Sequence, residues 1–180
     1  MIFSSAGHGG SDPGAIANGY READLTIEFR DLLNKELTEL GAKFISDKDG
    51  ETLGAYLGRI KTGDGSIIHE VHFNAATPAA TGIEVVIPDR HTREEFNCAF
   101  ELAAAIQKHT GLKLRGDKGV ITEGQTHRGK LGLMRPEGIN LLTEMCFISN
   151  ANDLKQYFQA KEAIAKDFAI ILKKYDDAKA

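Results

Sequence analysis

A glycine-rich loop directly after a short apolar segment constrains the fold of this chain more than any other feature. Residues 1–3 are predicted to form a brief buried strand, and four of the eight residues at positions 7–14 are glycine. Glycine lets the backbone turn sharply and pass close to a bound ion or ligand. His8 lies within the loop, and Glu22 stands at the predicted start of a helix. A histidine and a carboxylate presented in this way are two of the ligands that a catalytic metal site needs.

A loop of this kind can instead cradle phosphate. The dinucleotide-binding fingerprint requires spaced glycines that open a helix directly, whereas Pro13 and further loop residues intervene here. No Gly-Lys-Ser/Thr sequence follows, which excludes a P-loop. A lone histidine in a turn is more often structural than a metal ligand, so the case for a metal depends on the rest of the chain.

Composition describes an ordinary globular protein. The chain has 180 residues, of which 42% are hydrophobic and 27% charged, and we predict one domain over residues 1–180. The net charge of -4 gives no electrostatic reason to bind nucleic acid or an anionic membrane. Cys98 and Cys146 are too few for a disulfide framework and are expected to be buried thiols. No apolar run approaches the ~20 residues of a membrane span. We expect a monomer with no nucleic-acid or membrane partner.

Helix-like and strand-like segments alternate along the chain. Helices are predicted over residues 22–40, 53–63, 92–111 and 150–158, with a last helix around residues 164–172. Thr92 and Glu95 form a capping box, and Asn150 is expected to cap the helix that follows it. Strands are predicted at residues 1–3, 42–46, 66–75, 82–88, 113–115, 130–134 and 139–148. The alternation predicts an α/β fold with a largely parallel sheet and helices on both faces.

Two histidines lie on the predicted strand 66–75. His72 is near its carboxyl end, where α/β folds place their functional sites. His69 is three residues away, so the alternation of side chains along a strand should point the two imidazoles to opposite faces. Only one of them can join His8, and we favour His72 because it lies closer to the end of the strand. The alternative is a core histidine satisfied by a neighbour.

Glu144 interrupts the apolar segment 139–148. Burying an unpaired carboxylate is costly, so its presence indicates a cation, a metal-bound water or a substrate proton nearby. The alternative is a buried salt bridge to Arg115 or Arg135.

Together these residues resemble a known family. The motifs occur in one order along nearly the whole chain: Gly7-His8-Gly9-Gly10, Asp12-Pro13-Gly14-Ala15, Glu22, His72-Phe73-Asn74-Ala75, Gly82-Ile83-Glu84-Val85, Arg115-Gly116 and Glu144-Met145-Cys146-Phe147-Ile148-Ser149-Asn150. The set resembles the zinc-dependent N-acetylmuramoyl-L-alanine amidases of the Amidase_3 type. The chain departs from that family at two places: the family often has serine at Glu70 and glycine at Cys146.

The resemblance implies a mixed, mostly parallel sheet of about six strands. It also implies that His8, Glu22 and His72 hold Zn²⁺ and that Glu144 is catalytic. Such a ligand set leaves one position of tetrahedral zinc open for a water, whose pKa falls to ~7. Glu144 would take the proton of that water and return it to the departing amine. The bond cut would be the amide between N-acetylmuramic acid and L-alanine in peptidoglycan, the expected partner.

Two other functions stay open: a zinc peptidase or deacetylase acting on another amide, and a non-catalytic wall-binding module. Retention of all four residues argues against the module. The first strand begins at residue 1, and neither an apolar leader nor a wall-anchoring repeat is visible. We therefore expect a phage endolysin that stays in the host cytoplasm until it is released to the cell wall. If a leader is missing from the sequence, an extracellular or periplasmic enzyme is expected instead.

Overall fold

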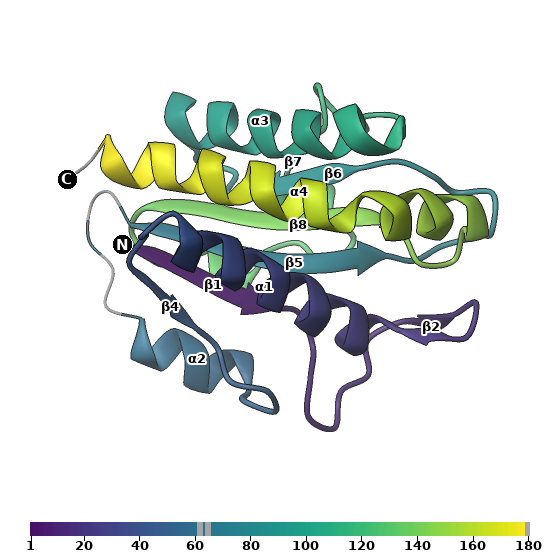
Figure 1. The fold of residues 1–180 in the computed structure, drawn as a ribbon, viewed down its shortest axis with the longest axis horizontal. Coiled ribbons are helices and arrows are strands. Elements are labelled where there is room, and N and C mark those ends of the chain that lie inside the picture. Colours follow the sequence, from purple (N-terminus) through teal and green to yellow (C-terminus); the bar gives the residue numbers. More distant parts are fainter. Residues whose placement is uncertain (61–62, 64–65, 179–180) are drawn as a thin grey trace.

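A single six-stranded sheet forms the centre of the protein (Figure 1). Its strands are β1 (Ile2–Ala6), β4 (Phe44–Ser46), β5 (Ile67–Asn74), β6 (Glu84–Ile87), β7 (Val120–Thr122) and β8 (Ile139–Phe147), in the spatial order β4-β1-β5-β8-β6-β7. The first four in that order run parallel, β6 is antiparallel to β8, and β7 is parallel to β6. This computed structural model describes residues 1–60, 63 and 66–178. The predicted mixed, mostly parallel sheet of about six strands is confirmed.

Helices cover the two faces of the sheet unequally. The long helices α1 (Glu22–Glu39), α3 (Arg93–Thr110) and α4 (Ala151–Asp177) pack together on one face, as Figure 1 shows, and bury the larger hydrophobic core. The other face carries only a small core, to which Tyr56 of α2 (Leu53–Arg59) and Leu133 of the 3-10 helix η2 (Gly132–Met134) contribute. Helices therefore lie on both faces as predicted, but the second face stays partly open.

The alternation of side chains along β5 and β8 divides polar from apolar residues. Ile67 and Val71 of β5 belong to the larger core, whereas Ile68 belongs to the smaller one. His72 shares the parity of Ile68 and therefore points to the partly open face. Residues His72 and Glu144 are direct partners in the parallel pairing of β5 with β8. The sheet thus sets an imidazole and a carboxylate side by side on its less covered face.

Several local predictions are confirmed. The Thr92–Glu95 capping box is formed at the start of α3, which ends at Gly111 in the left-handed conformation. The side chain of Asn150 caps α4 by accepting hydrogen bonds from the amides of residues 152 and 153. Both cysteines are buried free thiols. Among the described residues, no helix is long and apolar enough to cross a membrane.

At the edge of the sheet next to β6, the structure differs from the strands predicted at residues 113–115 and 130–134. Residues 113–115 contribute an isolated bridge between Leu114 and Ile83, and residues 132–134 form η2 in place of a strand. The true edge strand is β7, whose three residues are too few to show a period.

Other differences concern element boundaries. The segment before α1 forms a small hairpin, β2 (Ile16–Ala17) with β3 (Tyr20–Arg21), where no strand is predicted from the sequence. The two last predicted helices are one, α4, because residues 159–163 include no helix breaker. Helix α2 ends at Arg59, and residues 61–62 of its predicted extension lie outside the described residues.

Candidate metal centre and active site

His8, Glu22 and His72 meet at the carboxyl ends of β1 and β5. The Nε2 atom of His8 lies 3.3 Å from Oε2 of Glu22, and Nδ1 of His72 lies 3.0 Å from Oε1 of the same carboxylate. One ligand atom from each residue lies within 4.8 Å of the other two, and no further group of this kind occurs in the described part of the chain. The structure thus brings together the three residues that the sequence singled out.

Glu22 is fixed by backbone groups as well as by the two imidazoles. It is the first residue of α1, where the helix dipole favours a negative charge. Its Oε2 accepts a hydrogen bond from the amide of Ala15 at 2.9 Å, and its Oε1 accepts one from the amide of Phe73 at 3.0 Å. Because both oxygens are held, the carboxylate keeps its position between the histidines.

The glycine-rich loop places His8 through backbone conformations that few residues adopt. His8 itself has a φ of 67°, in the left-handed region. Its Nδ1 donates to Asp12 at 2.8 Å, which leaves Nε2 facing Glu22. A Cβ at Gly14 would lie 2.7 Å from both the Glu22 carboxylate and the His8 ring, so glycine is required there for a reason beyond its φ of 63°.

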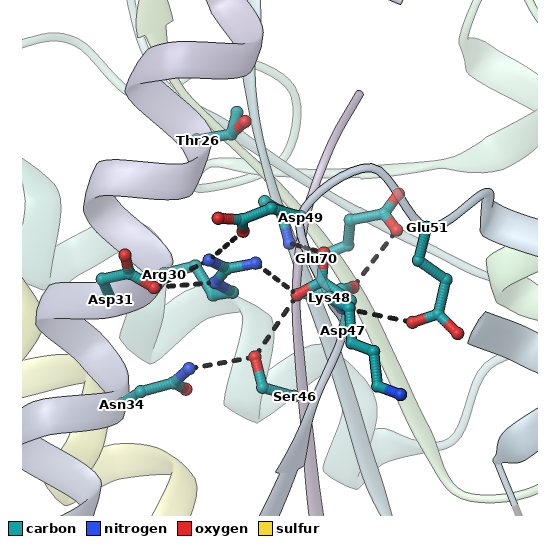
Figure 2. A network of polar contacts seen from close by, with 12 residues as sticks. Thr26, Arg30, Asp31, Asn34, Ser46, Asp47, Lys48, Asp49, Glu51 and Glu70 are labelled. Carbon is teal, nitrogen blue, oxygen red and sulfur yellow. Dashed lines mark hydrogen bonds and ion pairs between the residues drawn. The ribbon is translucent and has the colours of Figure 1, made fainter. Parts of the chain in front are cut away.

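A polar network fixes the end of β1, from which the glycine-rich loop continues (Figure 2). The guanidinium of Arg30 on α1 donates to Asp47 at 2.9 Å and to Asp49 at 2.7 Å. The other oxygen of Asp47 accepts from the amide of Ala6, the last residue of β1, at 3.3 Å. Arg30 and Asp47 thereby tie α1, the segment after β4 and the end of β1 together at the point where the glycine-rich loop begins.

The charges of the site are strongly coupled. Burial opposes protonation of His72, but hydrogen bonds to the carboxylates of Glu22 and Glu70 raise its pKa to about 10. Burial likewise opposes ionisation of Glu22, yet the hydrogen bonds from His72 and His8 hold the pKa of Glu22 well below its ordinary value. The hydrogen bond to Glu22 raises the pKa of His8 against the effect of burial. The carboxylate of Glu22 and the positive charge of protonated imidazole therefore stabilise each other in this cluster.

Glu144 lies beside this cluster with one oxygen unsatisfied. Its Oε2 is buried and has no hydrogen-bond partner among the described residues. Burial, with a smaller contribution from the charges of Glu22 and Glu84, raises the pKa of Glu144 to about 7. The alternative of a salt bridge to Arg115 is wrong, because that guanidinium pairs with Glu84 at 2.7 Å. An ion pair between Glu144 and Arg135 is likewise absent among the described residues.

Glu84 also belongs to the site, although the sequence motif that contains it indicated no role for it. It is the direct partner of Glu144 in the antiparallel pairing of β6 with β8. Its two oxygens are occupied by Asn74, which donates at 2.7 Å, and by Arg115. Both oxygens of Glu84 are therefore paired, and its side chain forms part of the wall of the site.

An open cleft of about 1040 Å³ gives access to these groups. His8, His72 and Glu144 line it, together with Arg115 and the exposed Arg128. The cleft thus joins the candidate ligands, the unpaired carboxyl and two cations in one solvent-accessible space.

His69 lies on the opposite face, as predicted. Its ring packs edge-on against Phe168 of α4, and its Nε2 lies 3.0 Å from the hydroxyl of Thr143. Burial lowers the pKa of His69 to about 3, so it is a neutral core residue.

The donor set fits a catalytic metal. Two imidazole nitrogens and one carboxylate oxygen are the protein ligands of many catalytic zinc centres, which keep one further position open. An unpaired carboxyl oxygen adjoins the ligands, and the cleft reaches them from solvent. The fold and the site together define an α/β protein with a candidate metal centre for hydrolysis.

Comparisons with known proteins agree with this class. The sequence profile of the N-acetylmuramoyl-L-alanine amidase family (Amidase_3) matches residues 2–172. A crystal structure described as an N-acetylmuramoyl-L-alanine amidase from Neisseria meningitidis has 30% sequence identity and a TM-score of 0.78, with 96% of this chain and 94% of that chain covered. An N-acetylmuramoyl-L-alanine amidase from Clostridium difficile 630 shares the fold, with a TM-score of 0.82 at 20% identity, over 99% of this chain and 97% of that one.

Curated sequences give the same answer. The endolysin of Bacillus phage SPP1 is 26% identical over 165 residues, which cover 85% of this chain and 56% of the endolysin. The amidase LytC of Bacillus subtilis is 25% identical over 171 residues, which cover 93% of this chain but only 33% of LytC. The chain belongs to the N-acetylmuramoyl-L-alanine amidase family, and it is an amidase that hydrolyses peptidoglycan.

Proposed function

We propose that His8, Glu22 and His72 hold a zinc ion and that Glu144 is the general base of amide hydrolysis. The observation that carries the assignment is the approach of the three ligand atoms to within 4.8 Å of one another. Glu144, whose buried Oε2 has no hydrogen-bond partner among the described residues, is the direct partner of His72 on the neighbouring strand. We take residues 1–180 as one catalytic domain.

The residues of the chain divide the chemistry between them. When bound, zinc supplies Lewis acidity for the carbonyl and for the attacking water. Glu144 accepts the proton of that water at Oε2 and later delivers it to the departing amine of L-alanine. A pKa near 7 suits both roles, because the group can hold or release a proton at neutral pH. Asp12 keeps the imidazole of His8 oriented throughout.

Metal analysis of matched variants tests the ligand set. The wild-type protein is expected to retain one zinc per chain after loading and dialysis, and His72→Ala is expected to lose it. His69→Ala is the matched control, because it removes an imidazole from the opposite face of the same strand. Full zinc retention in His72→Ala would overturn the assignment.

A second variant tests Glu144. Glu144→Gln preserves the shape of the side chain but cannot accept the proton, so we expect it to fold, to retain zinc and to lose about 10²–10⁴-fold in rate. Cleavage at the wild-type rate would show that Glu144 is structural.

We also propose that the protein acts on the cell wall in the manner of a phage lysin. The similarity to the endolysin of phage SPP1 supports this proposal. Cytoplasmic expression in a susceptible bacterium should leave cells intact until the membrane is permeabilised, and lysis should then require Glu144. Appearance of the protein outside intact cells would contradict it.

A further inference from the structure

Glu70 makes a contact with the candidate metal centre for which no role has been assigned. It lies two residues before His72 on β5, so both side chains project from the same face of the sheet. The Nε2 atom of His72 lies 3.0 Å from Oε1 of Glu70, while Nδ1 of the same ring faces Glu22. Glu70 and Glu22 therefore approach opposite edges of one imidazole.

This division of the ring assigns different tasks to the two carboxylates. Nδ1, the nitrogen that faces the candidate ligand Glu22, is the one positioned to bind a metal. The other nitrogen can then only donate a hydrogen bond, and Glu70 is its acceptor. Glu70 also lines a smaller cavity of about 330 Å³ and is not among the residues that line the large cleft. Its contact with the candidate ligands is the hydrogen bond to His72, so it is placed to act through that ring.

Glu70 is itself firmly positioned. Its second oxygen accepts a hydrogen bond from the hydroxyl of Ser5 on the neighbouring strand β1 at 3.2 Å. The Glu70 side chain is 7% exposed, whereas that of Asp12, which binds the outer nitrogen of His8, is 64% exposed. A hydrogen bond to a carboxylate is stronger when it is shielded from water. Of the two outer carboxylates, Glu70 is therefore the one whose hydrogen bond is shielded from water.

The backbone of the glycine-rich loop limits the His72 ring from another side. A Cβ at Gly7 would lie 2.3–2.6 Å from three atoms of that ring, so the imidazole rests directly on the Gly7 backbone. The ring plane is set by this contact, and the hydrogen bond to Glu70 sets which nitrogen carries the proton.

We propose that Glu70 is a positioning residue that fixes His72 with its proton on Nε2 and its metal-binding lone pair on Nδ1. The proposal rests on the assignment of His72 as a zinc ligand. Carboxylates that orient a metal-bound histidine typically contribute 10–100-fold to metal affinity.

Zinc affinity, measured by competition with a chromogenic chelator, gives the first test. We expect Glu70→Ser to weaken zinc binding by about 10–100-fold and Glu70→Gln, which keeps a neutral acceptor, to weaken it less. Asp167→Asn is the matched control, because it breaks a carboxylate–histidine pair with His109 at 2.8 Å outside the site. It should bind zinc as the wild type does.

Nitrogen-15 NMR of the histidine rings gives a readout that a purely structural role would not move. In the zinc-bound wild type we expect His72 to show a protonated Nε2 in slow exchange with water and a metal-bound Nδ1. This Nε2 proton should exchange faster in Glu70→Gln and be lost from the spectrum in Glu70→Ser. If Glu70→Ser does not fold, Glu70→Gln and the wild-type spectrum decide.

Wild-type affinity with an unchanged Nε2 signal in the Glu70 variants, or zinc bound at Nε2, would overturn the proposal. If instead His72→Ala retains zinc, the ligand set of the proposed function fails as well. The two failures are therefore distinguishable.

Discussion

The partly buried carboxyl of Glu144 should make the metal-free protein less stable as the pH rises. Its pKa is about 7 in the folded chain, against an ordinary value of 4.5, because burial and the nearby charges of Glu22 and Glu84 disfavour the ionised form. A folded-state pKa above the unfolded value favours the protonated form. The stability associated with Glu144 is therefore fully present below about pH 4.5 and is lost as the pH rises through about 7.

The size of the effect follows from the two pKa values. A difference of one pKa unit corresponds to about 1.4 kcal/mol. The gap between pKa values of 4.5 and about 7 therefore sets an upper bound of about 3 kcal/mol on the stability lost when Glu144 ionises. Glu144 borders the open cleft, and solvent there reduces the penalty, so we expect about 1–3 kcal/mol. Glu144→Gln has nearly the same shape and does not titrate, so it should escape the loss.

Urea unfolding of the metal-free wild type and Glu144→Gln measures the contribution of Glu144 to the free energy of unfolding. At about pH 4 to 5 the free energies of unfolding of wild type and Glu144→Gln should nearly coincide, and at about pH 8 the variant should be the more stable by the amount above. Other titrating groups are common to both proteins, so the difference between the two curves isolates Glu144. Equal curves at every pH, or a less stable variant at about pH 8, would refute the reasoning.

Three further predictions concern the frame of the site and its protons. Gly7→Ala should displace the His72 ring and weaken zinc binding by about 10-fold or more, whereas Gly54→Ala, where a Cβ meets no atom within 4 Å, should bind zinc normally in the same chelator competition. Because His72 is protonated in the metal-free protein, zinc binding should release protons, and zinc affinity should fall about tenfold for each proton released when the pH is lowered by one unit. Calorimetry in buffers of different ionisation enthalpy detects this proton release. Binding heats that do not depend on the buffer would contradict it. Arg30→Met should lower the free energy of unfolding by about 3 kcal/mol, because it leaves the buried Asp47 without its partner; a loss below about 1 kcal/mol in urea unfolding would show that solvent compensates.

The central part of the fold could be predicted from the sequence because its signals are local and repeated. Apolar periodicity located α1 and α3, and the capping residues Thr92 and Asn150 placed helix starts correctly. The sheet edge was missed because β7 has only three residues, and pairing with β6 is what makes it a strand. A strand that depends on a partner distant in sequence carries little signal of its own.

The difference between local signals and contacts distant in sequence also decides which parts of the site could be predicted. The parity argument that separated His72 from His69 predicted their opposite faces, and the structure confirms it. Applied to Glu70, the same argument would have placed that carboxylate beside His72. The pairing of Glu84 with Arg115 could not be foreseen, because it depends on the bridge between Leu114 and Ile83, two residues far apart in the sequence.

Digestion of purified peptidoglycan, followed by mass spectrometry of the fragments, tests the central claim most directly. The zinc-loaded protein should release intact stem peptides with a free L-alanine amino terminus and glycan strands whose N-acetylmuramic acid carries a free lactyl carboxylate. Glu144→Gln should release neither. Fragments cut within the stem peptide, or loss of acetyl groups from the glycan with the lactyl amide intact, would contradict the account and identify a peptidase or a deacetylase.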